Sequence, residues 1–447
     1  KEKIETLVHE GKMLPLINGD TPINFFGLPE IPLLLDVNNP NELTNNNAIY
    51  FYAESTEGHY SQENETHLNL YADRAYYYVS FDGGAGKRIT PATEPSAAAI
   101  QTITTFNDLQ YYEVDETSLS LVGRRWFGDR FDITTQRSYN FNFPNLVTTE
   151  PVQVRILLGG IAINTTSFSI GLNGDFLGTS SILSTGRDLP SRGSTFNRVV
   201  NATSDNIDVS LTYNKQGNPA ARGFLDYIQI QAVRELTADD QQFAFQNNQV
   251  AQEIGVGEYI LNNANRVDQV WDITDIHNVS YYANEQNAAN FSFKVNLGEL
   301  RKYQTFMTSN VLSPRIDASE RNVANQNLKG SIFTNAQGQF EDVDYLVITQ
   351  ANFLPQANRL ANLRANSSSL KTRVVNLQDI YNEFNSGKQD IAAIRNFIRY
   401  IYHNASSPEN RIKYIALVGD TSVDYKDRLQ NNNNIVPTFQ SLGSFAT

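Results

Sequence analysis

Three aspartates lie close together after an apolar segment near the end of the chain. Asp420, Asp424 and Asp427 follow the strand-like run Tyr414–Val418. Carboxylate oxygens at this density can hold Ca²⁺, which takes about six to eight oxygen ligands. The EF-hand pattern is absent, however, and Tyr425-Lys426 interrupts the cluster. The sequence leaves two interpretations: a calcium site, or a solvated loop in which Asp420 accepts hydrogen bonds from backbone amides.

A glycine-rich run, Phe81–Lys87, has part of the pattern of a phosphate-binding loop. In a P-loop the first glycine lies five positions before the last, and the lysine is followed by Ser or Thr. Here those positions hold Phe81 and Arg88, and no helix is predicted after the run. We therefore interpret the run as a hairpin turn rather than as a nucleotide site.

Residues 123–132 combine Trp126 with three arginines and two aspartates. Trp and Arg dominate binding hot spots, so this segment could be a recognition surface. It could equally be a structural staple between two strands, in which Arg–Asp pairs surround a packed tryptophan. We favour the structural interpretation.

The chain offers little else for nucleophilic or metal chemistry. It has no cysteine, which removes disulfides, thiolate metal sites and thiol nucleophiles from these 447 residues. No Gly-x-Ser-x-Gly elbow is present either. The histidines are scattered and lack the spacing of a metal site, apart from one that stands beside Glu10. We expect ordinary surface or core positions for all five, which are His9, His59, His67, His277 and His403.

Composition argues against two classes of partner. The net charge of −13 repels phosphate backbones, so we expect no nucleic acid partner. No basic cluster stands out on an amphipathic segment, which argues against a direct role at a membrane surface. No apolar run approaches the roughly 20 residues of a membrane-spanning helix. The chain begins at Lys1 without a signal-peptide pattern, so we expect a mature or trimmed product.

The elements that position these residues follow two different patterns. In residues 48–235, short runs alternate apolar and polar residues between Gly, Asn and Asp, which predicts β-strands. Asn173-Gly174, directly after Phe168–Leu172, predicts a type I′ hairpin because both residues tolerate positive φ. Evenly spaced short strands favour one or two sandwiches or jelly rolls.

After about residue 322 the pattern becomes that of a parallel sheet with crossover helices. Strand-like and helical runs alternate in the order Tyr345–Thr349, Pro355–Asn366, Thr372–Asn376, Asp390–His403 and Tyr414–Val418. The second helix has one apolar face, and Asp390 is placed to cap it. Functional loops of such sheets lie at the carboxyl ends of the strands, where Asp420 is found.

These patterns divide the chain into five parts. We expect an extended arm or linker at 1–46, which opens with a helix-like Lys1–Gly11. A β-rich domain at 47–149 and a sandwich or jelly-roll-like domain at 150–235 follow. A β-rich connecting segment at 236–321 then leads to the α/β part at 322–447.

The stretch Tyr345–Thr447 resembles the first subdomain of the gingipain family of cysteine peptidases. The blocks that carry this resemblance are YLVIT at 345–349, Val374–Gly387, Ile394–Tyr402, and above all YIALVGD at 414–420 with NIVPT at 434–438. Upstream blocks are similar to the β-rich N-terminal part of the gingipain-like sortase of the type IX secretion system; they are Glu54–Ile89, Gly123–Asp132, Tyr139–Leu146 and Leu225–Ile230. The resemblance covers roughly residues 47–447. It implies a mixed fold, with all-β sandwich or jelly-roll-like domains before the first part of an α/β caspase-like domain.

The resemblance also implies a function at the extracellular face of the bacterial outer membrane. Such a protein removes the C-terminal signal of secreted cargo and attaches the cargo to anionic lipopolysaccharide. The chemistry is acyl transfer by a thiolate that a nearby histidine activates. The implied partners are the outer-membrane barrel PorV, in some systems PorQ and PorZ, the C-terminal signal domains of cargo, and anionic lipopolysaccharide as acceptor.

The catalytic residues of the family have no counterpart in this sequence. In this family the histidine lies in a Gly-His-Gly motif and the cysteine on a later strand, and the chain contains neither. His403 does not fit, because it ends a helix upstream of the wrong strand. We therefore expect the catalytic pair beyond Thr447, in a longer protein. Two alternatives stay open: a non-catalytic cargo-binding relative at the translocon, and a surface adhesin or carbohydrate-binding module built on residues 150–235.

Overall fold

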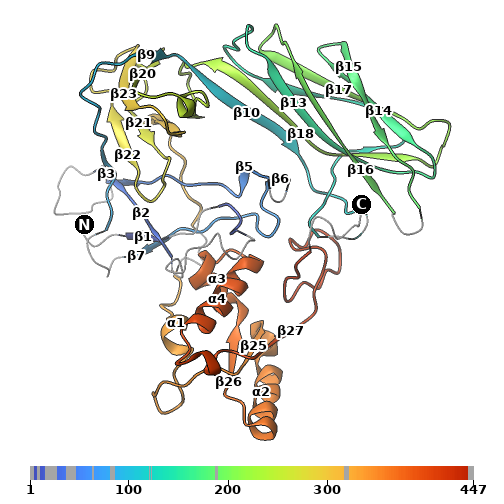
Figure 1. Ribbon diagram of the computed structural model, residues 1–447, viewed down its shortest axis with the longest axis vertical. Coiled ribbons are helices and arrows are strands. Elements are labelled where there is room, and N and C mark those ends of the chain that lie inside the picture. Colours follow the sequence, from blue (N-terminus) through green and yellow to red (C-terminus); the bar gives the residue numbers. More distant parts are fainter. Residues whose placement is uncertain are drawn as a thin grey trace. The chain divides into compact units, whose positions relative to one another are not determined.

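A computed structural model describes residues 5–7, 11–15, 28–36, 47–62, 65–80, 86–119, 121, 123–186, 190–316 and 322–440. The chain forms two compact units. Unit 1 comprises residues 1–87, 121–124 and 315–444, and unit 2 comprises residues 88–120, 125–314 and 445–447. Figure 1 labels their strands and helices. None of the helices in the described part of the chain is long and apolar enough to cross a membrane.

Unit 2 contains a β-sandwich, drawn in teal and green in Figure 1. Its strands are β10 (Thr105–Glu113), β11 (Arg130–Phe131), β12 (Gln136–Asn142), β13 (Val152–Ile161), β14 (Thr166–Leu172), β15 (Asp175–Ile182), β16 (Arg192–Val200), β17 (Asn206–Asn214) and β18 (Arg222–Glu235). One antiparallel sheet has the order β10-β18-β13-β16, with β11 also paired to β18, and the other has the order β12-β17-β14-β15. Every second side chain of β17 is buried, from Ile207 to Tyr213, because strand side chains alternate between the core and solvent. The predicted all-β sandwich is confirmed.

The hairpin between β14 and β15 has the predicted turn. Asn173 and Gly174 lie between the paired ends Leu172 and Asp175. Their φ angles are 51° and 90°, the left-handed values that a type I′ turn requires at both central residues. The turn therefore follows directly from the Asn-Gly pair.

Unit 2 also contains a second, smaller β core. Its strands are β8 (Thr90–Pro91), β9 (Gln101–Ile103), β19 (Ala244–Phe245), β20 (Val256–Leu261), β21 (Gln269–Asp272), β22 (Ser280–Ala283), β23 (Phe291–Asn296) and β24 (Tyr303–Phe306). They form the sheets β19-β24-β21-β22-β8 and β23-β20-β9. The ring centroids of Tyr259, Phe293 and Tyr303 lie 5.2 to 5.3 Å apart in the centre of this core.

The sheets do not follow the predicted domain ranges 47–149, 150–235 and 236–321. Strands β10 and β12 lie before residue 150, yet they pair with β18 and β17 and complete the sandwich. The segment 236–321 is also more than a connection, because with β8 and β9 it encloses a hydrophobic core of its own. Pairing between strands that are distant in the sequence decides these boundaries, and local patterns do not show it.

The first part of unit 1 is an arm of short strands: β1 (Glu5–Leu7), β2 (Glu30–Ile31), β3 (Leu34–Asp36), β4 (Ala48–Tyr50), β5 (Glu57–Ser61), β6 (Thr66–Leu68) and β7 (Tyr78–Ser80). The helix-like opening predicted for Lys1–Gly11 is wrong at residues 5–7, which form β1. This strand pairs antiparallel with both β2 and β7. Backbone pairing with two distant strands overrides the local helical propensity of the opening.

The rest of unit 1 contains an α/β arrangement with a parallel sheet, as predicted, and its helices lie on both faces of the sheet. Its strands are β25 (Tyr345–Thr349), β26 (Thr372–Asn376) and β27 (Tyr414–Val418), and its helices are α1 (Leu328–Ser331), α2 (Leu354–Ser368), α3 (Leu377–Asn385) and α4 (Ile391–His403). All three strands are parallel, in the order β26-β25-β27. Helix α2 covers the face of β25 with Val347, whereas α3 and α4 pack on the face with Ile348. Because β25 is buried on both faces, it reads as a continuous apolar run.

Candidate functional site

The carboxyl ends of the three parallel strands in unit 1 meet at one edge of the sheet. Thr349, the last residue of β25, is in register with Asn376 on β26 and with Val418 on β27. The Thr349 hydroxyl also donates a hydrogen bond of 2.6 Å to the carbonyl oxygen of Val418. In parallel α/β sheets ligands bind beyond this edge, so we treat it as the candidate site. We call it the carboxyl edge.

The loop after β27 is fixed against a later segment of the chain. The carbonyl oxygen of Asp420 accepts hydrogen bonds from the backbone N–H groups of Ile435 and Val436, at 3.0 and 3.1 Å. Gly419 has a φ of 141°, and a Cβ atom there would lie 2.3 Å from the Cγ2 atom of Ile435. Only glycine allows this close approach. The sequence blocks YIALVGD and NIVPT are therefore in direct contact, through backbone hydrogen bonds and the close approach at Gly419.

The three aspartates of this loop do not converge on a common point. The carboxylate of Asp424 is fully buried and accepts hydrogen bonds from the N–H groups of Leu429 and Lys426, at 2.6 and 3.3 Å. Arg428 lies 3.7 Å from the same carboxylate. The Asp420 carboxylate instead accepts from the Asn433 side chain, at 3.3 Å. Asp420 thus accepts hydrogen bonds from backbone amides, as predicted, but through its carbonyl oxygen; the carboxylate that binds backbone amides in this loop is that of Asp424.

Asp427 is exposed, with a left-handed φ of 59°. Among the described residues, no group of three His, Cys, Asp or Glu side chains could share a metal ion. A calcium ion would have to replace the backbone donors and the arginine that Asp424 already contacts. We therefore expect calorimetric titration of the chain with calcium chloride to give no saturable heat. A saturable signal that disappears in Asp420→Asn and Asp427→Asn would contradict this expectation.

The arm of unit 1 supports the same loop. The rings of Tyr71 and Tyr425 lie 5.0 Å apart, and burial raises the pKa of Tyr425 to about 12. Gln389 donates a hydrogen bond of 2.9 Å to the Tyr425 carbonyl oxygen, and Lys426 pairs with Asp73 at 2.7 Å. The position of the loop therefore depends on contacts with residues far earlier in the chain.

From Arg125 onwards, the Trp–Arg segment belongs to unit 2 and packs in its interior. Trp126 is 2% exposed. Arg125 forms an ion pair with the buried Asp226, whose pKa burial raises well above its ordinary value although the arginine opposes that shift. Asp129 accepts hydrogen bonds of 2.9 Å from the hydroxyls of Tyr112 and Tyr139. These contacts support the structural interpretation of this segment.

The histidines do not form a catalytic or metal-binding group in the described part of the chain. His67 is buried beside the ring of Tyr60, with 5.0 Å between ring centroids. His403 ends α4, as predicted, and its ring contacts the ring of Tyr402. His9, the side chain of His59 and residues 81–85 of the glycine-rich run lie outside the described residues.

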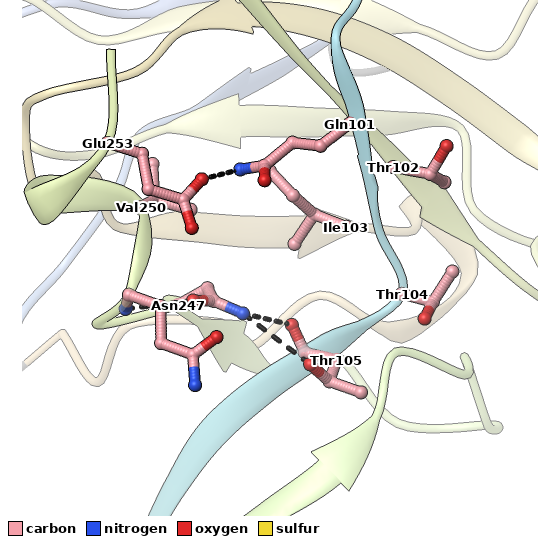
Figure 2. A pocket seen from close by; sticks show the side chains of 9 residues that line it. Gln101, Thr102, Ile103, Thr104, Thr105, Asn247, Val250 and Glu253 are labelled. Atoms are coloured by element: carbon pink, nitrogen blue, oxygen red, sulfur yellow. Dashed lines mark hydrogen bonds between the residues drawn. The ribbon is translucent and has the colours of Figure 1, made fainter.

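A small polar pocket of about 110 Å³ lies in unit 2 (Figure 2). It is lined by Gln101–Thr105 on one side and by Asn247, Gln249, Val250 and Glu253 on the other. The Gln101 amide donates to the Glu253 carboxylate, and Asn247 donates to the Thr105 carbonyl oxygen at 3.0 Å. No pattern in the sequence predicted this pocket. Its lining holds no nucleophile paired with a base, so it is not suited to acyl transfer.

The comparisons with known proteins agree with the architecture. The model of peptidase family C25 matches residues 339–447. Among solved structures, dimeric latent PorU from Porphyromonas gingivalis is similar, with a TM-score of 0.78 and 20% identity over 98% of this chain. This chain has the fold of PorU. It covers 41% of the length of the PorU chain. The resemblance inferred from the sequence is thus confirmed for the fold of the part of PorU that this chain covers and for the C25 segment at 339–447.

Other similarities are weaker. A CBM36 carbohydrate-binding module in complex with calcium and xylotriose aligns at a TM-score of 0.19 and 11% identity, over 29% of this chain and 99% of the module. A CBM35 module from Cellvibrio japonicus aligns at a TM-score of 0.20 and 12% identity, over 29% of this chain and 96% of the module. Similarities at this level carry no functional argument. No curated protein sequence matches the chain.

Proposed function

We propose that this chain is the N-terminal portion of a PorU-type cysteine peptidase and sortase of the type IX secretion system. The observation that carries the proposal is a combination of two findings, one for the C-terminal part of the chain and one for nearly all of it. The peptidase family C25 match covers residues 339–447, which include all three strands of the parallel sheet, while the similarity to PorU extends over 98% of the chain. A peptidase segment attached to this particular set of β domains points to the PorU branch rather than to a peptidase in general.

The proposed reaction is acyl transfer at the cell surface. A thiolate attacks the peptide carbonyl carbon before the C-terminal signal, and the signal leaves as an amine that takes its proton from the histidine. An amine of anionic lipopolysaccharide then attacks the thioester carbonyl carbon, gives a proton to the histidine and releases the thiolate. Because the 447 residues contain no cysteine, we propose that the cysteine and histidine follow Thr447 in a longer protein. In that protein, the carboxyl edge would help to hold the substrate peptide.

The decisive experiment compares the 447-residue chain with the longer protein encoded by the same gene. Each is incubated with a reporter that carries a type IX C-terminal signal, and the products are identified by mass spectrometry. We expect cleavage by the longer protein, loss of cleavage after alkylation of its thiols, and no cleavage by the 447-residue chain. Absence of a Gly-His-Gly motif and a later cysteine in the longer protein, or cleavage that survives alkylation, would refute the proposal.

The alternative of a non-catalytic, cargo-binding relative rests on the absence of cysteine. The same experiment separates the two functions. A longer protein that binds the reporter without cleaving it would favour the alternative.

The proposed partners PorV, PorQ and PorZ are tested by co-purification of the tagged longer protein from outer membranes. A glycan-binding screen of the full chain tests the remaining alternative, a carbohydrate-binding module or adhesin.

A further inference from the structure

One end of the β-sandwich in unit 2 brings together loops from four separate segments. We call the described residues of these four loops, 130–137, 161–166, 182–186 with 190–192, and 214–222, the sandwich tip. Strand register places them at the same end, since the facing pairs are Gln136 with Thr212, Ile161 with Arg222, Gly160 with Arg192, Thr166 with Ile182 and Ser167 with Asn214. Hydrogen bonds also connect these loops. The Thr185 N–H donates to the Ala162 carbonyl oxygen at 2.7 Å, and the Asn218 amide donates to the Asn164 side-chain oxygen at 2.7 Å.

The sandwich tip exposes three aliphatic side chains, each on a different loop. Ile133 is 99% exposed, Ile163 is 87% exposed and Leu183 is 61% exposed. A single exposed aliphatic residue is common on protein surfaces, whereas several at one place indicate an interaction site. The neighbouring Ile182 and Ala162 are buried in the sandwich core, so the loops themselves are anchored. The fold therefore holds the three exposed side chains on a fixed base.

The sandwich tip is cationic, although the chain as a whole is acidic. Its described residues include five Arg or Lys residues and one Asp residue, in a chain with a net charge of −13. Asp132 is already paired with Arg130 and, at 2.8 Å, with Lys215, and Arg137 pairs with Asp129 at 3.1 Å. Arg192 and Arg222 are partly exposed and form no ion pair with another described residue. The loops that carry the three aliphatic side chains thus also carry a net positive charge, with Arg192 and Arg222 as the cations outside these ion pairs.

We propose that the sandwich tip docks on an anionic lipid surface. Aliphatic side chains at loop ends can enter the boundary between head groups and acyl chains, while arginine and lysine contact the phosphates. The one aromatic residue of the four segments, Phe131, is fully buried. A protein interface is usually centred on exposed aromatic anchors, so the composition of the tip favours a membrane over a protein partner. This surface is independent of the proposed peptidase chemistry.

The first test is co-sedimentation of the full 447-residue chain with lipid vesicles. We expect binding to vesicles of phosphatidylcholine with phosphatidylglycerol, weaker binding to phosphatidylcholine alone, and a decrease with rising salt concentration. Phosphate and chloride at matched ionic strength should release the chain equally. Absence of binding to the anionic vesicles overturns the proposal. Release by phosphate in preference to chloride also overturns it, because the site would then hold a free anion.

Substitutions in the sandwich tip test whether the tip is the surface that binds the vesicles. The triple variant Ile133→Ser, Ile163→Ser, Leu183→Ser should bind anionic vesicles at least about tenfold more weakly, since each substitution removes one buried aliphatic side chain from the bound state. Arg192→Gln with Arg222→Gln should weaken binding and reduce its salt dependence. The matched control is Ile254→Ser with Leu312→Ser, which changes aliphatic residues that are 90% and 94% exposed elsewhere in unit 2. It should bind like the unchanged chain.

Two results would overturn the assignment. The first is triple-variant binding equal to that of the control, because the aliphatic residues would then play no part. The second is a triple variant that still binds vesicles like the unchanged chain but no longer captures a protein from outer-membrane extracts. The tip would then be a protein interface. Tryptophan fluorescence during urea unfolding checks that all variants keep the folded unit.

Discussion

Replacing Phe168 with alanine is expected to lower the free energy of unfolding of unit 2 by about 3 to 5 kcal/mol. Phe168 lies on β14 and is fully buried. Its ring meets that of Tyr213 on the neighbouring β17 at 4.8 Å, and that of Phe131 on β11 at 5.1 Å in an edge-to-face arrangement. Since β11 belongs to the opposite sheet, the ring of Phe168 joins the two layers of the sandwich.

The cavity left by this substitution cannot close easily. A Cβ atom on Gly223 would lie 2.6 Å from the Cζ atom of Phe168, so the backbone of β18 already touches the ring. That backbone is held by pairing with β13 on one side and β11 on the other. Movement of β18 into the space would break its hydrogen bonds with these two strands. The substitution therefore lowers the free energy of unfolding both by the lost burial of the ring and by the cavity that remains.

Tryptophan fluorescence during urea unfolding measures the effect, because both tryptophans, Trp126 and Trp271, belong to unit 2. Phe176→Ala is the matched control. Phe176 lies on the adjacent β15 and is 72% exposed, so its loss should change the free energy of unfolding by less than about 0.5 kcal/mol. Equal effects of the two substitutions would show that the Phe168 ring does not hold the layers together.

The features predicted correctly from the sequence are those that neighbouring residues determine. Asn173-Gly174 specifies its hairpin because positive φ is a property of those two residues. The run Tyr345–Thr349 predicts a strand buried on both faces, since each of its side chains is apolar or can form an internal hydrogen bond. Asp390 specifies the start of α4 through its own side chain.

The features that the sequence did not reveal depend on distant partners. Strand β10 has the polar residues Asn107, Asp108 and Gln110 in its middle, so its sequence does not show the alternation of apolar and polar residues typical of a strand. Asp108 forms an ion pair of 2.9 Å with Arg234 on β18. Strand β16 buries one large side chain, Phe196, and otherwise resembles a polar loop. In both strands, the neighbouring strand provides the stabilisation.

The candidate site shows the same division. The Val-Gly-Asp sequence predicted a loop at the carboxyl end of a strand, and the structure has that loop. Its attachment to Ile435 and Val436 and its support by Tyr71 could not be read from the sequence, because both are tertiary contacts. The sandwich tip was missed for a related reason. Its cations are spread over residues 130–222, so no local window appears basic.

Replacing Asp390 with alanine is expected to destabilise unit 1 by about 2 kcal/mol at neutral pH. Asp390 is fully buried at the start of α4. One carboxylate oxygen accepts from the Ala392 N–H at 2.7 Å, and the other accepts from the Leu14 N–H at 2.9 Å. Alanine would leave both backbone donors without this partner, and Leu14 would lose its connection between the arm and the α/β layers.

The stability contributed by Asp390 should also depend on pH. Burial raises the pKa of this carboxyl above the ordinary value of 3.8, against the opposing effect of its two backbone hydrogen bonds and of Lys388 and Arg395. Between the ordinary and the raised pKa, the folded state holds a proton that the unfolded state has released. The free energy of unfolding therefore falls as pH rises through this window, and below it the contribution is fully present.

Asp390→Asn isolates this effect, because asparagine keeps one acceptor oxygen and does not titrate. The helical circular dichroism signal reports on unit 1, which contains all four described α-helices. The difference in unfolding free energy, unchanged chain minus Asp390→Asn, should decrease as pH rises from the ordinary aspartate range towards neutrality. Comparing the two chains cancels the titration of the other carboxyls. A difference that grows with pH would mean that the hydrogen bonds to Ala392 and Leu14 outweigh burial and hold the carboxylate ionised.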